Sequence, residues 1–480
     1  MTYAALALVV AVIGLGFVAA PVAYLLYPVT TLLAALLLLW RKPGGYVAFV
    51  WAVWFITPFV RRVVDLDIGY TEASIVMLAP FVVTGIAIFA VIPRLHELPK
   101  TLRVPLGLVV LGLAYAYLVG VLYNGLVGAT FDLLNWGAPV VGALYMLTHW
   151  REMGVLEPSL RRTFGTGLIL MSLYGMWQFF APNPWDSYWM EQALLNDGLN
   201  SIGTPEPYEV RVFSTMNAPG PFAVTLMVGL LLLFGGPLGF WWLAFALGVV
   251  AFALSLVRSA WGGWVLGLLF FIARLPKAMQ LRYLSFMVIV TLIGVPIISL
   301  GPMGEVLGER FSTLGDIQED TSFNDRLSLY GDIGEFVVGN PLGRGLGSTG
   351  VGADLSTGEA LQDLDSGIIA VVFTFGALGT LYFAAGALFL FGVSVVKGFL
   401  STNRFAVACS AVTLACGSQL LFGNSWTGVS GMGLWFFAAC GLASIVYQAE
   451  HNAAAAFAEP GAQPVVVAKG YRQLGGSASD

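Results

Sequence analysis

The chain consists of long apolar runs separated by short polar connections. A membrane-spanning helix needs roughly 20 predominantly apolar residues, and most of these runs approach that length. They predict about fourteen spanning helices, with twelve as the lower bound, because the run at 260–273 is short and the turn at Pro21 is weakly marked. The predicted spans are 3–20, 22–40, 46–60, 73–92, 104–122, 133–148, 164–181, 217–234, 238–257, 260–273, 283–300, 367–396, 404–422 and 427–447.

The first apolar run, residues 3–40, is about twice as long as one span and is interrupted by Pro21. A cleaved signal peptide has an apolar core of only about 7–15 residues. We therefore expect this run to be retained as two helices joined by a tight turn.

Composition leads to the same fold class. Of the 480 residues, 58% are hydrophobic and 10% are charged, and the mean hydropathy is +0.84. Because a soluble domain carries about 25% charged residues, this chain cannot cover a water-facing surface with ions. A soluble enzyme, a nucleic-acid-binding domain and a disordered scaffold are excluded. The prediction is an all-α, polytopic helical membrane protein.

The basic residues of the connections favour one orientation, since cytoplasmic connections collect Lys and Arg. With the N-terminus inside, the inside segments hold 15 of the 22 basic and 6 of the 27 acidic residues. The opposite orientation would reverse this bias, so we expect both termini in the cytoplasm. The inside segments are then 41–45, 93–103, 149–163, 235–237, 274–282, 397–404 and the C-terminal tail.

Two predicted outer connections are long: residues 181–215 and residues 301–365. Connections of this length are usually functional. The second carries a weak helical pattern around 326–338, which the stretch NPLGRGLG at 340–347 ends. The tail from about residue 449 is Ala-rich, ends in LGGSASD, and is predicted to be disordered.

Seven arginines and no lysine lie in the predicted outer segments. A guanidinium can bind phosphate through two parallel hydrogen bonds, whereas an ammonium acts as a point charge, so this choice indicates phosphate recognition. The alternative, open for each arginine, is an ion pair with one of the outer acidic residues. The seven are Arg61, Arg62, Arg211, Arg258, Arg310, Arg326 and Arg344.

Two of these arginines lie where apolar helices are predicted to begin. Arg258 stands in ALSLVRSAWGGWVLGL, and an ionisable residue near membrane depth is a functional candidate, although it could instead reach to the headgroups. Arg211 stands in EVRVFSTMNAPGPFAV. There Asn217 and the Pro-Gly-Pro sequence indicate a helix start, whose N–H groups could bind an anion. Asn217 could equally be a simple cap.

An outer-face reaction would need a carboxylate base, because all three histidines fall on the inside. Asp365 is the preferred candidate. It lies in QDLDSGIIAVVFTFG at the mouth of a long apolar run, where desolvation favours a general base. Asp365 and Ser366 could also cap that helix. The other acidic candidates are Asp325, Asp332, Glu335 and Asp363.

Aromatic residues of the outer loops are candidates for stacking on sugar rings. Trp185, Tyr188 and Trp189 lie in the first long loop, and Tyr330 lies in the second. The first three could equally be aromatic residues of the membrane interface.

The sequence gives no sign of a metal, cofactor or nucleotide site. Cys409, Cys416 and Cys440 lie in apolar runs without zinc spacing. The segment GRGLG at 343–347 is only superficially like a phosphate loop, because it lacks the preceding strand and the Lys-Ser/Thr pair. We therefore expect neither a cofactor nor a nucleic-acid partner.

Four motifs occur in a fixed order around one large outer loop. They are RVFSTMNAPGPFA, SLVRSAWGG, DRLSLYGDIGEFVVGNPLGRGLG and LDSGIIAVVFTFGALG. This order resembles the O-antigen ligase and Wzy-type polysaccharide polymerase superfamily, over roughly residues 205–385. The resemblance implies a GT-C-like fold. It divides the chain into N-terminal helices (1–204), the ligase- or polymerase-like core (205–385, with outer loop 301–365), C-terminal helices (386–448) and a cytoplasmic tail (449–480).

The resemblance also implies roles for residues. Members of the superfamily are metal-independent inner-membrane glycosyltransferases that use undecaprenyl-pyrophosphate-linked sugars. Arg258 matches the arginine that follows the helix before the large loop, and Arg326 matches the arginine inside it; with Arg211 and Arg344 they would hold the pyrophosphate. The pair Asp365-Ser366 stands where the ligases carry a catalytic histidine, and a carboxylate base fits a polymerase better.

The function implied is that of an O-antigen or exopolysaccharide polymerase at the outer face of the bacterial inner membrane. Its partners would be undecaprenyl-pyrophosphate-linked oligosaccharide and membrane lipid, with a chain-length regulator and a flippase as further candidates. One alternative is a ligase that passes the glycan to a lipid or protein acceptor. The other is a transporter or flippase, although the sequence contains neither an internal repeat nor a clear pair of broken helices.

Overall fold

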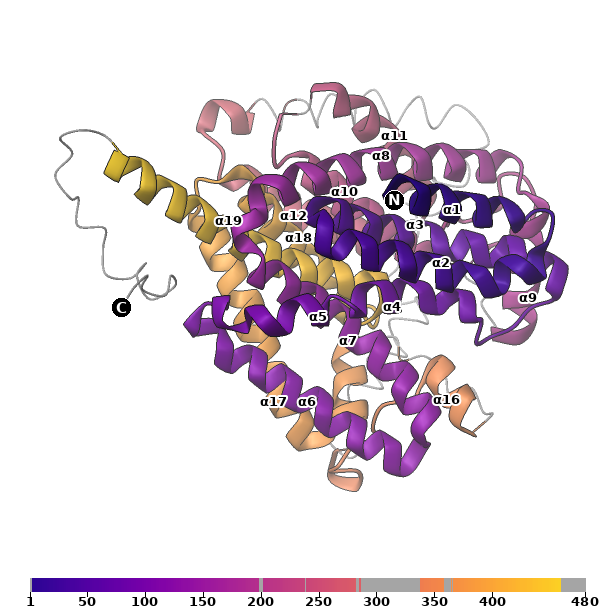
Figure 1. The fold of residues 1–480 in the computed structure, drawn as a ribbon. Helices are drawn as coiled ribbons and strands as arrows, with labels where there is room; N and C mark the ends of the chain where they lie inside the picture. Colours follow the sequence, from indigo (N-terminus) through magenta and orange to yellow (C-terminus); the bar gives the residue numbers. More distant parts are fainter. Residues whose placement is uncertain are drawn as a thin grey trace, which may run out of the picture.

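The computed structural model describes residues 2–197, 202–237, 239–281, 337–357 and 366–458, together with Ser285 and Leu364. Within these residues all the regular secondary structure is helical. Its one β-type contact is the isolated bridge between Gly203 and Val210. Figure 1 shows the helices as a bundle from which the end of the C-terminal helix projects.

Apart from α9 and α16, the α-helices lie close to the predicted apolar runs. They are α1 (Thr2–Leu15), α2 (Ala20–Arg41), α3 (Pro43–Ile68), α4 (Ala79–Gly85), α5 (Ile88–Val91), α6 (Lys100–Asn124), α7 (Leu126–Thr148), α8 (Met153–Phe180), α9 (Pro184–Asp197), α10 (Pro219–Leu233), α11 (Trp242–Leu254), α12 (Arg258–Ala273), α16 (Gly350–Thr357), α17 (Gly367–Leu400), α18 (Arg404–Ser418) and α19 (Gly428–Ala458). Short 3-10 turns join several of them: η1 (Ile75–Leu78), η2 (Ile92–Glu97), η3 (Trp150–Glu152), η5 (Gly239–Trp241) and η7 (Gln419–Leu421).

The protein is a membrane-embedded, multi-pass helical protein. Seven helical segments of the described chain are long and apolar enough to cross a membrane. Thirteen of the predicted runs coincide with helical segments, and the run at 283–300 lies outside the described residues apart from Ser285. The all-helical class is therefore confirmed, while the count of fourteen spans stays a prediction.

Three boundaries differ from the prediction. The first turn lies at residues 16–19, and Pro21 stands in the first turn of α2, where its missing N–H costs nothing. The run at 73–92 is divided into η1, α4, α5 and η2. Helix α19 continues to Ala458, ten residues into the predicted tail, because the alanines there have the highest helix propensity.

Contacts between connections identify two ends of the bundle. At one end, which we call the Arg94 end, Arg94 Nη1 bonds Glu152 at 2.7 Å and Arg151 pairs with Glu97. At the other, which we call the Arg258 end, α12 begins beside the end of α18. The full alternation of the spans and the assignment of the Arg94 end to the cytoplasm stay predictions.

The glycine-rich stretch at 340–347 is wedged between α6 and α17. Leu346 N bonds Ala116 O at 2.9 Å, and Gly345 N bonds Thr374 O at 2.9 Å. Gly345 has φ +76, and Gly120 of α6 lies directly against the backbone of Leu346. Helix α17 is kinked at this level, at Gly376. A side chain at Gly120 has no room, so this glycine sets how closely the stretch approaches α6.

Replacing Gly120 by Ala therefore tests this packing. Its Cβ would overlap the backbone of Leu346, and such overpacking costs about 1–3 kcal/mol. We expect a lower melting temperature for the purified Gly120→Ala protein in detergent. Gly107→Ala, in the same helix but with open space around the new Cβ, is the control and should melt at or slightly above the wild-type temperature. Equal melting of both variants would contradict the wedged arrangement.

Candidate functional site

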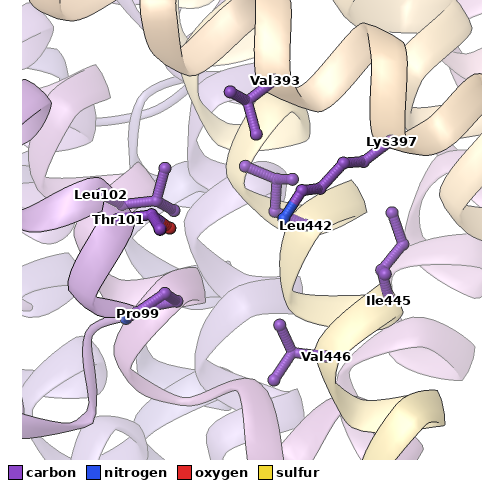
Figure 2. Close-up of a pocket in the computed structure, with 8 residues that line it drawn as sticks. All are labelled: Pro99, Thr101, Leu102, Val393, Lys397, Leu442, Ile445 and Val446. Carbon is purple, nitrogen blue, oxygen red and sulfur yellow. The ribbon is translucent and has the colours of Figure 1, made fainter. Parts of the chain in front are cut away.

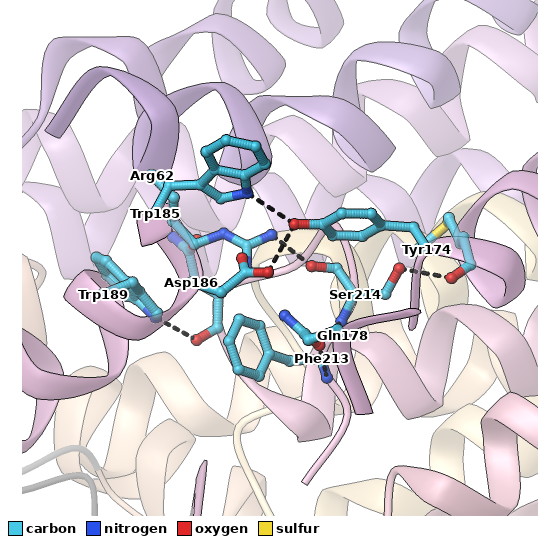
Figure 3. Close-up of polar contacts among 10 residues, drawn as sticks. Arg62, Tyr174, Gln178, Trp185, Asp186, Trp189, Phe213 and Ser214 are labelled. Atoms are coloured by element: carbon cyan, nitrogen blue, oxygen red, sulfur yellow. Dashed lines mark hydrogen bonds and ion pairs between the residues drawn. The ribbon is translucent and has the colours of Figure 1, made fainter. Parts of the chain in front are cut away.

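The segment at 211–218, which leads into α10, has no regular structure and is held by side chains of α3, α8 and α9 (Figure 3). Gln178 Oε1 accepts the backbone N–H groups of Phe213 and Ser214, at 3.1 and 2.8 Å. The Arg62 guanidinium donates to Ser214 O, and Trp189 Nε1 donates to Asn217 O at 2.9 Å. Because buried backbone groups must find partners, these side chains replace the hydrogen bonds that a helix would have supplied.

A buried ion pair between Arg62 and Asp186 contacts this segment at Ser214. Arg62 Nη1 lies 2.5 Å from Asp186 Oδ1, and both side chains are 0% exposed. Tyr174 OH donates to Asp186 Oδ2 at 2.7 Å and accepts from Trp185 Nε1 at 2.8 Å. The chain of contacts joins α3, α8 and α9 to Ser214. A charge buried at this depth is tolerated because it is paired and hydrogen-bonded.

The neighbouring arginine, Arg61, also binds groups of the protein itself. Arg61 Nε bonds Asp65 Oδ2 at 3.1 Å, and the guanidinium lies 4.6 Å from the centre of the Trp189 ring. Arg61 and Arg62 thus take the alternative role considered for the outer arginines, pairing with acidic residues. Trp189 is 3% exposed, so a sugar could stack on it only after α9 moved.

Arg211 and Arg258 are brought to one turn of the chain. Arg211 Nη2 donates to Leu256 O at 3.1 Å, and Val212 N donates to Leu254 O at 3.1 Å. Leu256 has φ +55, a conformation that a leucine adopts only under constraint. Arg258 follows as the first residue of α12. Two arginines that are 47 positions apart in sequence therefore flank a single non-helical turn.

We call the turn at residues 255–257, with Arg211 and Arg258 beside it, the arginine turn. The 3-10 turn η7 connects it to the start of α17. Gln419 Nε2 donates to Ser259 O at 3.0 Å, and Gln419 is 4% exposed. Ser366 Oγ donates to Leu420 O at 3.4 Å and also accepts from Ile369 N as the cap of α17. The capping role considered for Ser366 is present. Asp365, one residue earlier, lies outside the described residues.

Gln419 was missed by the sequence analysis. Its signal was a polar residue near the end of the apolar run LACGSQLLFG. The length of a run does not reveal which neighbouring backbone group such a residue will bond.

The helix start at Pro219 is a poor anion site in itself. Ala218 is its cap residue, and Asn217 makes no cap bond to the helix. Pro219 and Pro221 have no N–H, and Phe222 N bonds Ala218 O. Gly220 is the one residue of the first turn that keeps an N–H without an intrahelical acceptor. The start of α12 differs, because Arg258, Ser259 and Ala260 all retain their N–H donors and no side chain caps them.

The arginine turn is recessed below the ends of the longer helices. Helices α10, α11 and α12 have 15, 13 and 16 residues, so at 1.5 Å per residue they are about 20–24 Å long, shorter than the ~30 Å hydrocarbon core. Arg62, which contacts Ser214, lies six residues before the end of α3, or about 9 Å below it. Ser214 and the segment around it therefore lie below the end of α3.

Helix α9 covers the recessed segment from outside. Trp189, Met190 and Ala193 of α9 form a small apolar cluster with Ile202, Val210 and Phe213. The cluster is separate from the main core and is the main apolar contact between α9 and the segment below it. Helix α9 itself was not predicted, because its mixed polar and apolar residues make no long apolar run.

The remaining candidates lie elsewhere or beyond the described chain. Arg344 is exposed in the wedge between α6 and α17, where Asn124 Nδ2 donates to its carbonyl at 2.8 Å. Trp185 packs edge-on against Phe17 and Phe59. Outside the described residues lie Arg326, Tyr330, Asp325, Asp332, Glu335, Asp363 and Asp365.

The described part of the chain contains no group of three or more His, Cys, Asp and Glu side chains placed to hold a metal ion. No protein-family model matches the chain, and no curated protein matches it. The features that bear on function are therefore the geometry of the arginine turn and the order of the motifs.

The buried ion pair can be tested by a double-mutant cycle. Arg62→Met should lower the free energy of unfolding by about 3–5 kcal/mol, because Asp186 is left charged and unpaired in the interior. Adding Asp186→Leu should recover much of that loss, since the orphaned charge is gone. Thermal unfolding of the purified protein in detergent is the measurement.

The control for this cycle is the exposed pair Arg94–Glu152, whose side chains are 45% and 26% exposed. Arg94→Met should change stability by about 0–1 kcal/mol. Strictly additive effects of the Arg62 and Asp186 substitutions would show that the two side chains do not interact as described.

Proposed function

We propose that the protein is a polysaccharide polymerase. It transfers a growing glycan from undecaprenyl pyrophosphate to a lipid-linked repeat unit at the Arg258 end, which faces the outer side of the bacterial inner membrane. The proposal is supported by the motif order that resembles the ligase and polymerase superfamily, and by the geometry around Arg258.

The observation that carries the proposal is the recessed turn shared by Arg211 and Arg258. A lipid pyrophosphate lies at the level where the hydrocarbon core meets the headgroups, with its glycan in water and its tail in lipid. The two guanidiniums and the N–H groups at the uncapped start of α12 are positive, which suits the negative charge of a pyrophosphate. In this proposal they lie at the depth of the lipid headgroups.

In the reaction, the bond between the anomeric carbon and the pyrophosphate oxygen breaks as the acceptor hydroxyl attacks that carbon. Arg258, with Arg211 and Arg326, stabilises the charge that develops on the departing pyrophosphate. Asp365, beside the Ser366 cap, orients the hydroxyl and accepts its proton. The electron pair leaves with the pyrophosphate, and direct displacement inverts the configuration at the anomeric carbon. The large outer loop and Arg344 position the two chains.

The position of the histidines favours a polymerase over a ligase. His96 and His149 lie at the Arg94 end, beside Glu97 and Tyr145. His451 lies 23 residues along α19 from its start at the Arg258 end. The catalytic histidine of the ligases thus has no equivalent at the Arg258 end, and a carboxylate base takes its place in the proposal.

A transporter remains the candidate from another class. The kink of α17 at Gly376 and the break at residues 255–257 are interruptions of the kind that line binding sites in transporters. They occur in helices without a repeat relationship, so we rank this function second.

Deleting the gene in its native host separates the three functions. Mass spectrometry of the lipid-linked saccharides should then show single repeat units accumulating on undecaprenyl pyrophosphate. Long lipid-linked polymer that never reaches its acceptor would instead indicate a ligase. An unchanged profile would reject glycosyl transfer and favour the transporter.

Arg258→Ala should reproduce the deletion, with polymer lowered at least 100-fold, because loss of one charge-stabilising donor costs about that much. Arg258→Lys should recover little, since an ammonium lacks the paired geometry. Arg162→Ala, an exposed arginine on α8, is the control and should make polymer of normal length. Full-length polymer from Arg258→Ala would remove Arg258 from the site.

Gln419 should act as a positioning residue for α12. Gln419→Leu removes the bond to Ser259 O and should lower the turnover rate about ten-fold while the Michaelis constant for the lipid-linked donor changes less than two-fold. Gln280→Leu, which removes a similar bond from Gln280 Nε2 to Leu275 O at 2.9 Å away from the site, is the control. A Gln419→Leu protein with normal turnover would show that this bond serves stability alone.

A further inference from the structure

A small hollow lies far from the arginine turn, where the start of α6 meets the end of α17 and the middle of α19 (Figure 2). Its walls are apolar apart from two side chains, Thr101 and Lys397. The lining residues are Pro99, Thr101, Leu102, Val393, Lys397, Leu442, Ile445 and Val446. This hollow is at the Arg94 end, and the proposed transfer reaction does not use it.

Lys397 is the unexplained group of this hollow. It is half-buried, and Figure 2 shows its side chain reaching from α17 toward Leu442 on α19. Among the described residues, its ammonium has neither a hydrogen-bond acceptor nor an ion-pair partner. A lysine that only covers apolar surface extends its charge into water, whereas this one directs it into an apolar space.

The neighbouring charges do not neutralise Lys397. Arg103 is committed to the carbonyl groups of Leu98 and His96, and Lys100 on the same turn adds a second positive charge. The acidic residue of α19, Glu450, is exposed one turn beyond Val446 and forms no ion pair with Lys397 among the described residues. The local field is therefore positive and favours an anion.

The depth of the hollow identifies the anion's source. Lys397 lies three residues before the end of α17, and Lys100 begins α6, so both lie where the hydrocarbon core meets the headgroups. The outward faces of the same helices are apolar, with Val104 at 71% and Val396 at 58% exposed. An apolar wall beside a cation at this depth fits an acyl chain joined to a phosphate.

We propose that this hollow is a specific site for an anionic membrane phospholipid. The lipid phosphate binds the Lys397 ammonium and accepts a hydrogen bond from Thr101 Oγ1. The upper part of an acyl chain packs against Leu102 and Val446. Basic pockets between spanning helices bind phospholipid headgroups in this way. A bound lipid would tie α6, α17 and α19 together, independently of the function at the Arg258 end.

The test uses the purified full chain in a neutral detergent, with phosphatidylglycerol, phosphatidylcholine or inorganic phosphate added. Phosphatidylglycerol should raise the melting temperature, and native mass spectrometry should show it retained. Phosphatidylcholine and inorganic phosphate should have little effect. Equal stabilisation by phosphatidylcholine would overturn the charge recognition, and equal stabilisation by inorganic phosphate would overturn the lipid as the ligand.

Variants then locate the site. Lys397→Gln should weaken the apparent affinity for phosphatidylglycerol about five-fold, as expected for loss of one cation near an anionic lipid. Lys397→Arg should retain it. Lys277→Gln, which removes an exposed lysine elsewhere in the chain, is the matched control and should bind like the wild type. Unchanged binding by Lys397→Gln would overturn the proposal, even where phosphatidylglycerol stabilises the wild type.

Discussion

The Arg258 end depends on one constraint: backbone that leaves a helix at membrane depth must still be hydrogen-bonded. The segment at 211–218 leaves helical geometry there, and side chains supply what the helix would have supplied. Gln178 accepts hydrogen bonds from two backbone N–H groups, and Arg62 and Trp189 each donate one to a backbone carbonyl. Asp186 holds Arg62 in place through an ion pair. Without these contacts, the arginine turn would have no fixed position.

The same constraint explains why polar residues collect at that end. Helices α10, α11 and α12 are shorter than α3 and α8, which leaves room for non-helical chain beside the longer helices. Shorter helices bury less apolar surface and so contribute less to stability. In the proposed polymerase, they would leave the space in which Arg211 and Arg258 meet the pyrophosphate of the lipid-linked donor.

The sequence predicted the elements better than their contacts. Apolar runs located nearly every described helix, since run length is a local property. The partner of Arg62 is Asp186, 124 residues away, and no local pattern indicates which of the outer arginines will be neutralised in this way. Arg61 and Arg62 looked like phosphate ligands for the same reason as Arg211 and Arg258: all four are arginines in outer segments. Gln419 was overlooked because its importance comes from the backbone group that it happens to face.

Polymerisation itself can be measured with the purified protein reconstituted in vesicles and supplied with single repeat units on undecaprenyl pyrophosphate. If the protein is the proposed polymerase, mass spectrometry should show a ladder of lipid-linked oligomers, formed in the presence of a metal chelator and without a nucleotide. The Arg258→Ala protein, with the melting temperature of the wild type, should leave the single units unchanged. Single units that persist with the wild-type protein, or a normal ladder from the variant, would rule out a polymerase that acts through Arg258.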